Sequence, residues 1–174
     1  MEGADIVCCT LSGAAAAIKM CLRCPIKTVV IDEAAQSVEA SCLVPLQASP
    51  SRCVLFGDPR QLPATTFSRD ADATRYSRSL FERLQEGGHG AHVLSVQYRM
   101  HPQIRQFPSD HFYSGLLTDG RSEGDAPWHA HPLFPPVVLY DVHGGEHERG
   151  RGGTSLINVA EARVCALFLR ALAA

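Results

Sequence analysis

VVIDEAAQ, residues 29–36, is the stretch that decides the fold. Its continuous Val and Ile run predicts a strand that is buried on both faces of a parallel sheet. Asp32 and Glu33 then lie beyond the carboxyl end of that strand, where ligands bind in open α/β sheets. Two adjacent acids at this place fit a divided task, one holding a cation and one handling a water molecule. A strand end followed by an acidic helix N-terminus, which the helix dipole favours, is the alternative that this stretch alone leaves open.

A second strand of the same kind favours the functional interpretation. RCVLFGDPRQLPAT, residues 52–65, repeats the apolar run and places Asp58 directly after Gly57. The residues between the two strands are enough for one crossover helix, and 34–46 can supply it until Pro45 ends it. The two strands are therefore expected to be parallel neighbours in one sheet.

The turn after the second strand carries further polar groups. Gly57 is expected to permit an unusual backbone angle, and Pro59 to fix the turn that presents Arg60 and Gln61. Because the carboxyl ends of parallel strands meet at one edge of a sheet, four polar side chains should gather there: Asp32, Glu33, Asp58 and Gln61.

The rest of the chain alternates between strand-like and helix-like segments, which predicts an α/β fold with a mainly parallel sheet. Further strands are expected at 4–10, 91–97 and 135–142, and further helices at 14–22, 79–85, 101–113 and 158–172. The stretches 66–78 and 143–153 are polar or rich in glycine and predict surface loops. Asn158 and Glu161 form an N-x-x-E capping box at the start of the last helix.

Length and composition set broad bounds on the function. The chain has 174 residues, 45% of them hydrophobic and 20% charged, which fits a globular chain about one domain long and excludes fibrous and disordered classes. No membrane-spanning segment is expected. The formal net charge of −2 gives no global attraction to nucleic acid, so such binding must come from a local patch.

The cysteines raise the alternative of a zinc-binding module. An odd count of seven cysteines fits reduced thiols inside a cell, in the nucleus or the cytoplasm. Cys21 and Cys24 form a C-x-x-C pair, but a zinc site needs a second pair of ligands at similar spacing. His143 and His147 have that spacing and lie far along the chain in a Gly/Arg-rich loop. We therefore expect no zinc, and small cysteines packed in the core.

Three segments together resemble a known family. DEAAQ (32–36), GDPRQLPAT (57–65) and VQYRMHPQI (96–104) are similar, in order and spacing, to the second, third and fourth motifs of superfamily 1 helicases of the senataxin and nonsense-mediated-decay type. Further matches at 4–14, 107–120 and 155–162 extend the resemblance over nearly the whole chain.

The resemblance implies a RecA-like P-loop NTPase fold that is incomplete in this chain. Residues 1–90 would be the later part of the first RecA-like domain, with motifs II and III. Residues 91–174 would be the beginning of the second, with motif IV. The implied function is that of an ATP-dependent helicase or translocase, which couples hydrolysis of Mg²⁺-bound ATP to movement on single-stranded RNA or DNA.

The resemblance also assigns roles to the acids and to the glutamine. In the family, the residue at the position of Asp32 holds Mg²⁺ through water, and the residue at the position of Glu33 orients or deprotonates the attacking water. Gln61 matches the polar residue that senses the γ-phosphate of ATP. Asp58 also matches an ATP-site position, although its own task is not assigned.

Other roles fall on the fourth motif and on two loops. Tyr98 matches an aromatic residue that stacks on adenine, and Arg99 matches an arginine that reaches the γ-phosphate. An arginine of this kind is worth about 10³–10⁵ in rate. The positions implied for contact with nucleic acid are Thr10, Ser12 and the Pro63-Ala64-Thr65 segment.

One required motif is absent from these residues. A P-loop reads G-x-x-x-x-G-K-[ST], and neither lysine of the chain, Lys19 or Lys27, follows a glycine. We therefore expect the chain to be a middle slice of a helicase core whose remainder is its partner, and to be inactive on its own. A catalytically inactive, helicase-like fragment that binds protein or nucleic acid is the alternative.

Overall fold

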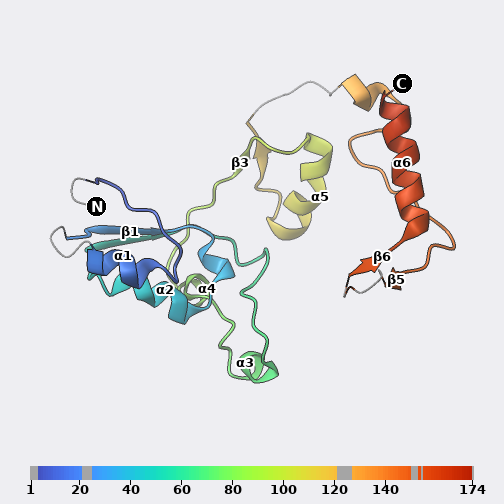
Figure 1. The fold of residues 1–174 in the computed structure, drawn as a ribbon. Coiled ribbons are helices and arrows are strands. Elements are labelled where there is room, and N and C mark those ends of the chain that lie inside the picture. The colour runs from blue at the N-terminus through green and yellow to red at the C-terminus, as the bar shows by residue number, and fades with distance from the viewer. Residues whose placement is uncertain (1–3, 21–24, 121–126, 150–152, 154, 174) are drawn as a thin grey trace. The chain divides into compact units, whose positions relative to one another are not determined.

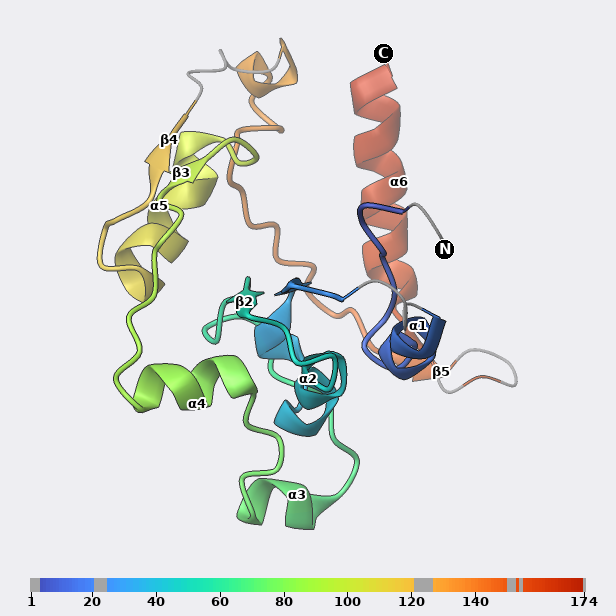
Figure 2. The same ribbon diagram turned by 90° about the vertical axis from the view of Figure 1, so that its left-hand side faces the viewer.

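The computed structural model describes residues 4–20, 25–120, 127–149, 153 and 155–173 (Figures 1 and 2). The chain consists of two compact units, Met1–Val93 and Leu94–Ala174. That these units are parts of a first and a second RecA-like domain stays a prediction.

The first unit is built on a pair of strands. β1 (Thr28–Ile31) and β2 (Arg52–Leu55) pair in parallel, in a register that runs from Thr28 opposite Arg52 to Ile31 opposite Leu55. The predicted parallel pair is therefore confirmed. Two helices, α1 (Ala14–Met20) and α2 (Glu39–Leu46), lie below this pair in Figure 1.

The core of the first unit lies on one face of β1. Ile31 is 4% exposed and clusters with Ala34, Cys42 and Leu80. Side chains of a strand alternate between its two faces, and Val30 on the other face is 59% exposed. The prediction that this strand is buried on both faces is wrong for the described residues, because the core cluster covers one face alone.

The segment between the two strands is not one helix. It forms a short 3₁₀ turn, η1 (Ala34–Gln36), and then α2. The backbone N–H of Ala34 donates to the carbonyl oxygen of Phe56 at 2.7 Å. This bond holds the start of the segment against the residue that follows β2. Pro45 does not end α2 at once, since the helix includes it and runs to Leu46.

Two other expectations for the first unit need correction. The predicted loop 66–78 contains a short helix, α3 (Arg69–Ala73), and the hydroxyl of Ser68 accepts a hydrogen bond from the N–H of Asp70 at 3.2 Å. Residues 4–10 form no strand, because no neighbouring strand pairs with them in the described part of the chain. The predicted helices at 14–22 and 79–85 are present as α1 and as α4 (Leu80–Glu86).

In the second unit, a helix lies beside a short parallel pair. β3 (Val96–Gln97) pairs in parallel with β4 (Thr118–Asp119), and α5 (Pro102–Phe112) lies next to both in the two ribbon views (Figures 1 and 2). The predicted helix is confirmed and passes through Pro108. The strand predicted at 91–97 is limited to its last two residues.

The remaining elements of this unit are a 3₁₀ turn, two strands of two residues each and a long helix: η2 (Pro127–Ala130), β5 (Glu148–Arg149), β6 (Leu156–Ile157) and α6 (Val159–Ala173). The pair β5–β6 is antiparallel, so the predicted loop 143–153 is wrong at β5. The predicted strand 135–142 is absent, because no strand among the described residues pairs with it.

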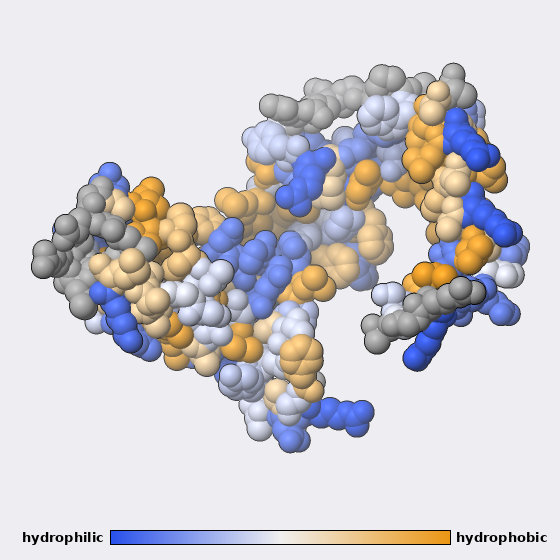
Figure 3. Space-filling view, viewed as in Figure 1, coloured by the Kyte–Doolittle hydropathy of each residue, from blue (hydrophilic) through white to orange (hydrophobic). Residues whose placement is uncertain are grey.

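The capping box of α6 is confirmed. The side-chain oxygen of Asn158 accepts from the N–H of Glu161 at 3.1 Å, and the Asn158 amide donates to the Glu161 carboxylate at 2.8 Å. Figure 3 shows hydrophobic and hydrophilic residues of α6 together on the face in view. Leu167 is 61% and Leu169 is 68% exposed.

An α/β fold with short parallel strand pairs is therefore present. None of the helices that the structure describes is both long and apolar enough to cross a bilayer.

Candidate functional site

The edge of the β1–β2 pair brings two of the motif segments together. The carbonyl of Ile31 accepts from the N–H of Phe56 at 2.8 Å, and the carbonyl of Phe56 accepts from the N–H of Ala34 at 2.7 Å. These bonds continue the parallel pairing beyond the last strand residues. The segments 32–36 and 57–61 therefore leave the sheet at the same edge, as predicted.

Gly57 is required here for a reason other than the one expected. It is not among the described glycines with positive φ, which are Gly88, Gly115 and Gly144. A β-carbon at Gly57 would lie 2.8 Å from the backbone nitrogen of Ala35. The glycine therefore serves close approach of two backbones, and the prediction of an unusual backbone angle is wrong.

Glu33 has a left-handed backbone, with φ 50° and ψ 38°. Such a conformation costs a non-glycine residue about 1–2 kcal/mol. The Oδ1 atom of Asp32 accepts from the Glu33 N–H at 3.1 Å, and the Oε2 atom of Glu33 accepts from the Gln36 side chain at 3.1 Å. Both carboxylates are exposed. The turn therefore presents the two acids to solvent from a backbone held in place.

Asp58 organises the turn that follows β2. Its Oδ1 atom accepts from the N–H of Arg60 at 3.0 Å, and its Oδ2 atom accepts from the side-chain amide of Gln61 at 3.1 Å. Asp58 is half-buried and Gln61 is exposed. The aspartate thus orients the glutamine, which is a task that the motif alone did not reveal.

The segments predicted to touch nucleic acid are exposed. The hydroxyl of Thr10 accepts from the N–H of Gly13 at 3.1 Å, which leaves Thr10 in a turn before α1. Ser12, Pro63 and Thr65 are exposed, whereas Ala64 between the last two is 7% exposed and anchors them.

Tyr98 and Arg99 lie in the second unit, in the turn after β3. Tyr98 is 67% exposed and Arg99 is also exposed. The side-chain oxygen of Gln97 accepts from the backbone N–H groups of Arg99, at 2.9 Å, and Met100, at 2.7 Å. The turn is therefore held by the side chain of the strand's last residue.

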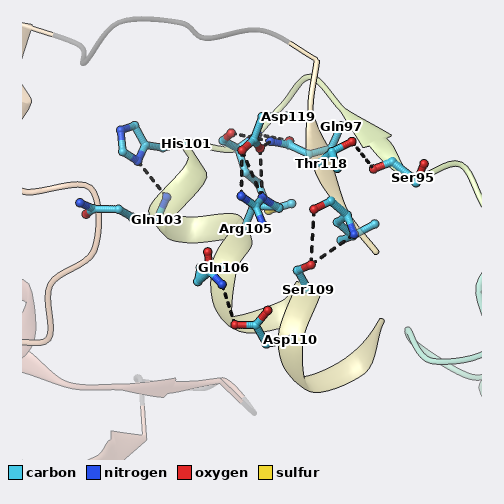
Figure 4. A network of polar contacts seen from close by, with 12 residues as sticks. Ser95, Gln97, His101, Gln103, Arg105, Gln106, Ser109, Asp110, Thr118 and Asp119 are labelled. Atoms are coloured by element: carbon cyan, nitrogen blue, oxygen red, sulfur yellow. Dashed lines mark hydrogen bonds and ion pairs between the residues drawn. The ribbon is translucent and has the colours of Figure 1, made fainter. Parts of the chain in front are cut away.

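A charged pair supports this turn (Figure 4). Arg105 on α5 donates to both carboxylate oxygens of Asp119, from Nη2 at 2.9 Å and from Nε at 3.2 Å. The Asp119 carboxylate also accepts from the Gln97 amide. The Arg105 guanidinium, and after it the Gln97 amide, hold the pKa of Asp119 below its ordinary value. Sequence reasoning assigned no role to these three residues, although both segments that contain Gln97 and Asp119 were matched to the family.

The cysteines are distributed differently from the expectation. Cys42 is fully buried, which raises the pKa of its thiol. Cys8, Cys9, Cys53 and Cys165 are exposed, so the prediction of core cysteines is wrong for them. Cys21 and Cys24, on which the zinc alternative rests, lie outside the described residues.

Comparison with protein families defines the class of this chain. A family model described as an AAA domain matches residues 1–69, and a second model with the same description matches residues 76–174. The second match covers more than half of the chain. The chain therefore belongs to this AAA domain family, whose fold is that of P-loop NTPases.

Individual relatives narrow the assignment. The probable helicase MAGATAMA 3 of Arabidopsis thaliana is 40% identical over 99% of this chain and 22% of its own length. Helicase SEN1 of Saccharomyces cerevisiae is 40% identical over 92% of this chain and 7% of its own length. The ATP-dependent helicase NAM7 of the same yeast is 36% identical over 95% of this chain and 17% of its own length.

These matches confirm the resemblance found in the motifs, and the chain is a member of the Upf1-like superfamily 1 helicases. It spans between 7% and 22% of the length of these three relatives.

Proposed function

We propose that this chain carries part of the ATP-hydrolysing core of an intracellular superfamily 1 helicase or translocase, which moves on single-stranded RNA or DNA. The observation that carries the proposal is the joining of the segments 32–36 and 57–61 at one sheet edge by the backbone bonds of Phe56. Hydrolysis of ATP depends mainly on positioning and on charge neutralisation, so an edge that holds two acids and a glutamine suits it.

The two acids have separate tasks in this proposal. One oxygen of Asp32 is engaged by the Glu33 N–H, and the carboxylate is exposed to solvent. Magnesium prefers oxygen ligands, keeps several waters and binds through one or two carboxylates together with substrate phosphates, so Asp32 fits it. When bound, Mg²⁺ neutralises charge on the β- and γ-phosphates. Glu33 orients the attacking water and accepts its proton.

The glutamine and the fourth motif complete the contacts with ATP. Gln61, oriented by Asp58, hydrogen-bonds the γ-phosphate. Tyr98 stacks on the adenine ring, and Arg99 reaches the γ-phosphate. The exposure of Tyr98 and Arg99 supports these roles, since both side chains are accessible to a ligand.

Single-stranded nucleic acid is proposed to run over two exposed loops of the first unit. Thr10 and Ser12 form one loop, and Pro63 and Thr65 form the other, where the buried Ala64 fixes the backbone. The hydroxyl groups of Thr10, Ser12 and Thr65 suit contacts with phosphate oxygens, which carry no sequence information.

Substitution of Glu33 by Gln tests the proposed chemistry. ATP hydrolysis is measured, with a single-stranded oligonucleotide, in the longest natural polypeptide that contains this chain. Glu33→Gln keeps the size of the side chain but removes the base, so we expect kcat to fall by about 10²–10⁴-fold with ATP binding retained. The isolated 174 residues, which contain no P-loop sequence, are expected to show no measurable hydrolysis.

The matched control is Glu146→Gln, at an exposed glutamate of the second unit. It should leave kcat unchanged. Equal hydrolysis by Glu33→Gln and the parent would contradict the proposal. Retained binding of nucleic acid with no hydrolysis by the parent would favour the inactive binding module.

A further inference from the structure

The side-chain amide of Gln97 uses all of its hydrogen-bonding capacity in one turn. Its oxygen accepts from the N–H groups of Arg99 and Met100, and its nitrogen donates to the carbonyl oxygen of Met100 at 2.8 Å and to the carboxylate of Asp119. A primary amide has two donors and an oxygen with two lone pairs, so every position is filled. Gln97 therefore fixes the backbone of the turn that carries the side chains of Tyr98 and Arg99.

The amide of Gln97 is itself held in one orientation. Asp119 accepts from its nitrogen, and Arg105 holds Asp119 with a two-pronged ion pair whose side chains are 16% and 18% exposed (Figure 4). A carboxylate at this place accepts only and therefore selects the nitrogen side of the amide. The oxygen of Gln97 is then left to face the two backbone N–H groups.

Gly120 positions the ring of Tyr98. The N–H of Gly120 donates to the carbonyl oxygen of Gln97 at 2.9 Å, which keeps residue 120 beside the turn. A β-carbon on Gly120 would overlap atoms of the Tyr98 ring. Because Gly120 is not among the described glycines with positive φ, its backbone would accept alanine, and only the ring stands in the way.

We propose that Gln97 and Gly120 are positioning residues for the proposed ATP contacts, Gln97 for Arg99 and Gly120 for Tyr98. The proposal rests on the function proposed above for Tyr98 and Arg99. Asp119, the last residue of β4, and Gly120, which follows it, would then position Arg99 and Tyr98 for their contacts with ATP. Asp119 acts on Arg99 through Gln97. Gly120 has no side chain, so the Tyr98 ring can lie directly against its backbone.

Substitution of Gly120 by Ala tests the tyrosine half. In the longest natural polypeptide that contains this chain, Gly120→Ala displaces the ring and should raise the KM for ATP about tenfold, with kcat nearly unchanged, because stacking binds the ground state and the transition state alike. In a Tyr98→Ala background it should add nothing further, since the ring is gone. Gly90→Ala is the control, because a β-carbon there meets nothing within 4 Å.

Substitution of Gln97 by Met tests the arginine half. The variant keeps the length of the side chain and removes all four hydrogen bonds, so kcat should fall about a hundredfold through misplacement of Arg99, with a smaller change in KM. Gln103→Met, at an exposed glutamine of α5, is the matched control and should leave both constants unchanged.

Amide hydrogen exchange in the 174-residue chain provides a readout that does not depend on turnover. Gln97→Met should raise the exchange rates of the Arg99 and Met100 amides about tenfold or more, and Gln103→Met should not. Unchanged exchange in Gln97→Met would overturn the positioning role.

The kinetic outcomes separate the two proposals. If Tyr98→Ala and Arg99→Ala impair hydrolysis while Gly120→Ala and Gln97→Met do not, the positioning roles are wrong and the proposed function stands. If Tyr98→Ala and Arg99→Ala have no effect, the roles proposed for these two residues are wrong and the positioning proposal falls with them.

Discussion

Gly57 shows how one missing side chain allows the proposed site to form. Gly57 was expected to permit an unusual backbone angle, and that expectation is wrong. The glycine is required instead because a β-carbon at Gly57 would lie 2.8 Å from the nitrogen of Ala35. The two backbones that approach each other here follow the ends of two different strands, so sequence inspection could not reveal the approach.

Substitution of Gly57 by Ala should therefore destabilise the first unit. The new methyl group must push one of two hydrogen-bonded backbones away, at a cost of about 1–3 kcal/mol. Urea unfolding of the 174-residue chain measures the effect. Gly90→Ala, which adds a methyl group in open space, should leave the unfolding midpoint unchanged or raise it slightly. Equal midpoints for the two variants would contradict the close-approach argument.

The left-handed backbone of Glu33 is a second residue-scale feature that the sequence does not reveal. A glutamate has no preference for φ 50°, and the conformation persists because Ala34 is bonded to Phe56 and Asp32 accepts from the Glu33 N–H. Strain of this kind concentrates at functional sites, which agrees with the task proposed for Glu33.

At the scale of elements, one ion pair joins two helices of the first unit. Arg83 of α4 donates from Nε and from Nη2 to the two carboxylate oxygens of Glu39 on α2, each at 2.7 Å. The hydrogen bond from Arg83 lowers the pKa of Glu39. The two residues are far apart in the sequence, so neither helix pattern could predict the pair.

The stability that comes from Glu39 should depend on pH. Because its pKa is lower in the folded chain, the contribution is fully present above the unfolded pKa of about 4.3 and is lost as pH falls through the folded pKa. Glu39→Gln should lower the urea midpoint at pH 7 and converge with the parent in more acidic solution. Glu146→Gln, at an exposed glutamate, should match the parent throughout. A deficit in Glu39→Gln that persisted at acidic pH would contradict the ion-pair origin.

The elements themselves were predicted unevenly. α1, α4, α5 and α6 were predicted from local sequence patterns, such as the capping box of α6, which act within a few residues of sequence. The strands expected at 4–10 and 135–142 were wrong, because a strand exists only where a neighbour pairs with it. The segment 34–46 was predicted as one helix and is divided at Ser37 and Val38, whose backbones are extended.

At the scale of the molecule, burial divides the cysteines that the structure describes into two classes. Cys42 lies in the core cluster with Ile31 and Leu80, and burial raises the pKa of its thiol. Cys8 and Cys165 are exposed. Since the thiolate is the reactive form, the Cys42 thiol is protected because reagents cannot reach it and because its raised pKa keeps it protonated.

Alkylation with iodoacetamide at mildly alkaline pH, mapped by mass spectrometry, should therefore modify Cys8 and Cys165 readily and Cys42 only after unfolding. Urea should abolish the difference by exposing the core. Modification of Cys42 in the folded chain at the rate of Cys165 would contradict the core assignment.

The sequence by itself determined the family, the parallel pair β1–β2 and the arrival of Asp32, Glu33, Asp58 and Gln61 at one edge. These follow from local runs and from the rule that parallel strands end together. Only the tertiary structure showed that Asp58 orients Gln61, that Gly57 serves close approach, that the Gln97 side chain holds the backbone of Arg99, and that Gly120 lies against the ring of Tyr98. The physical reason is that hydrogen bonds and steric contacts such as these depend on the exact placement of groups, often from distant segments, which no local pattern encodes.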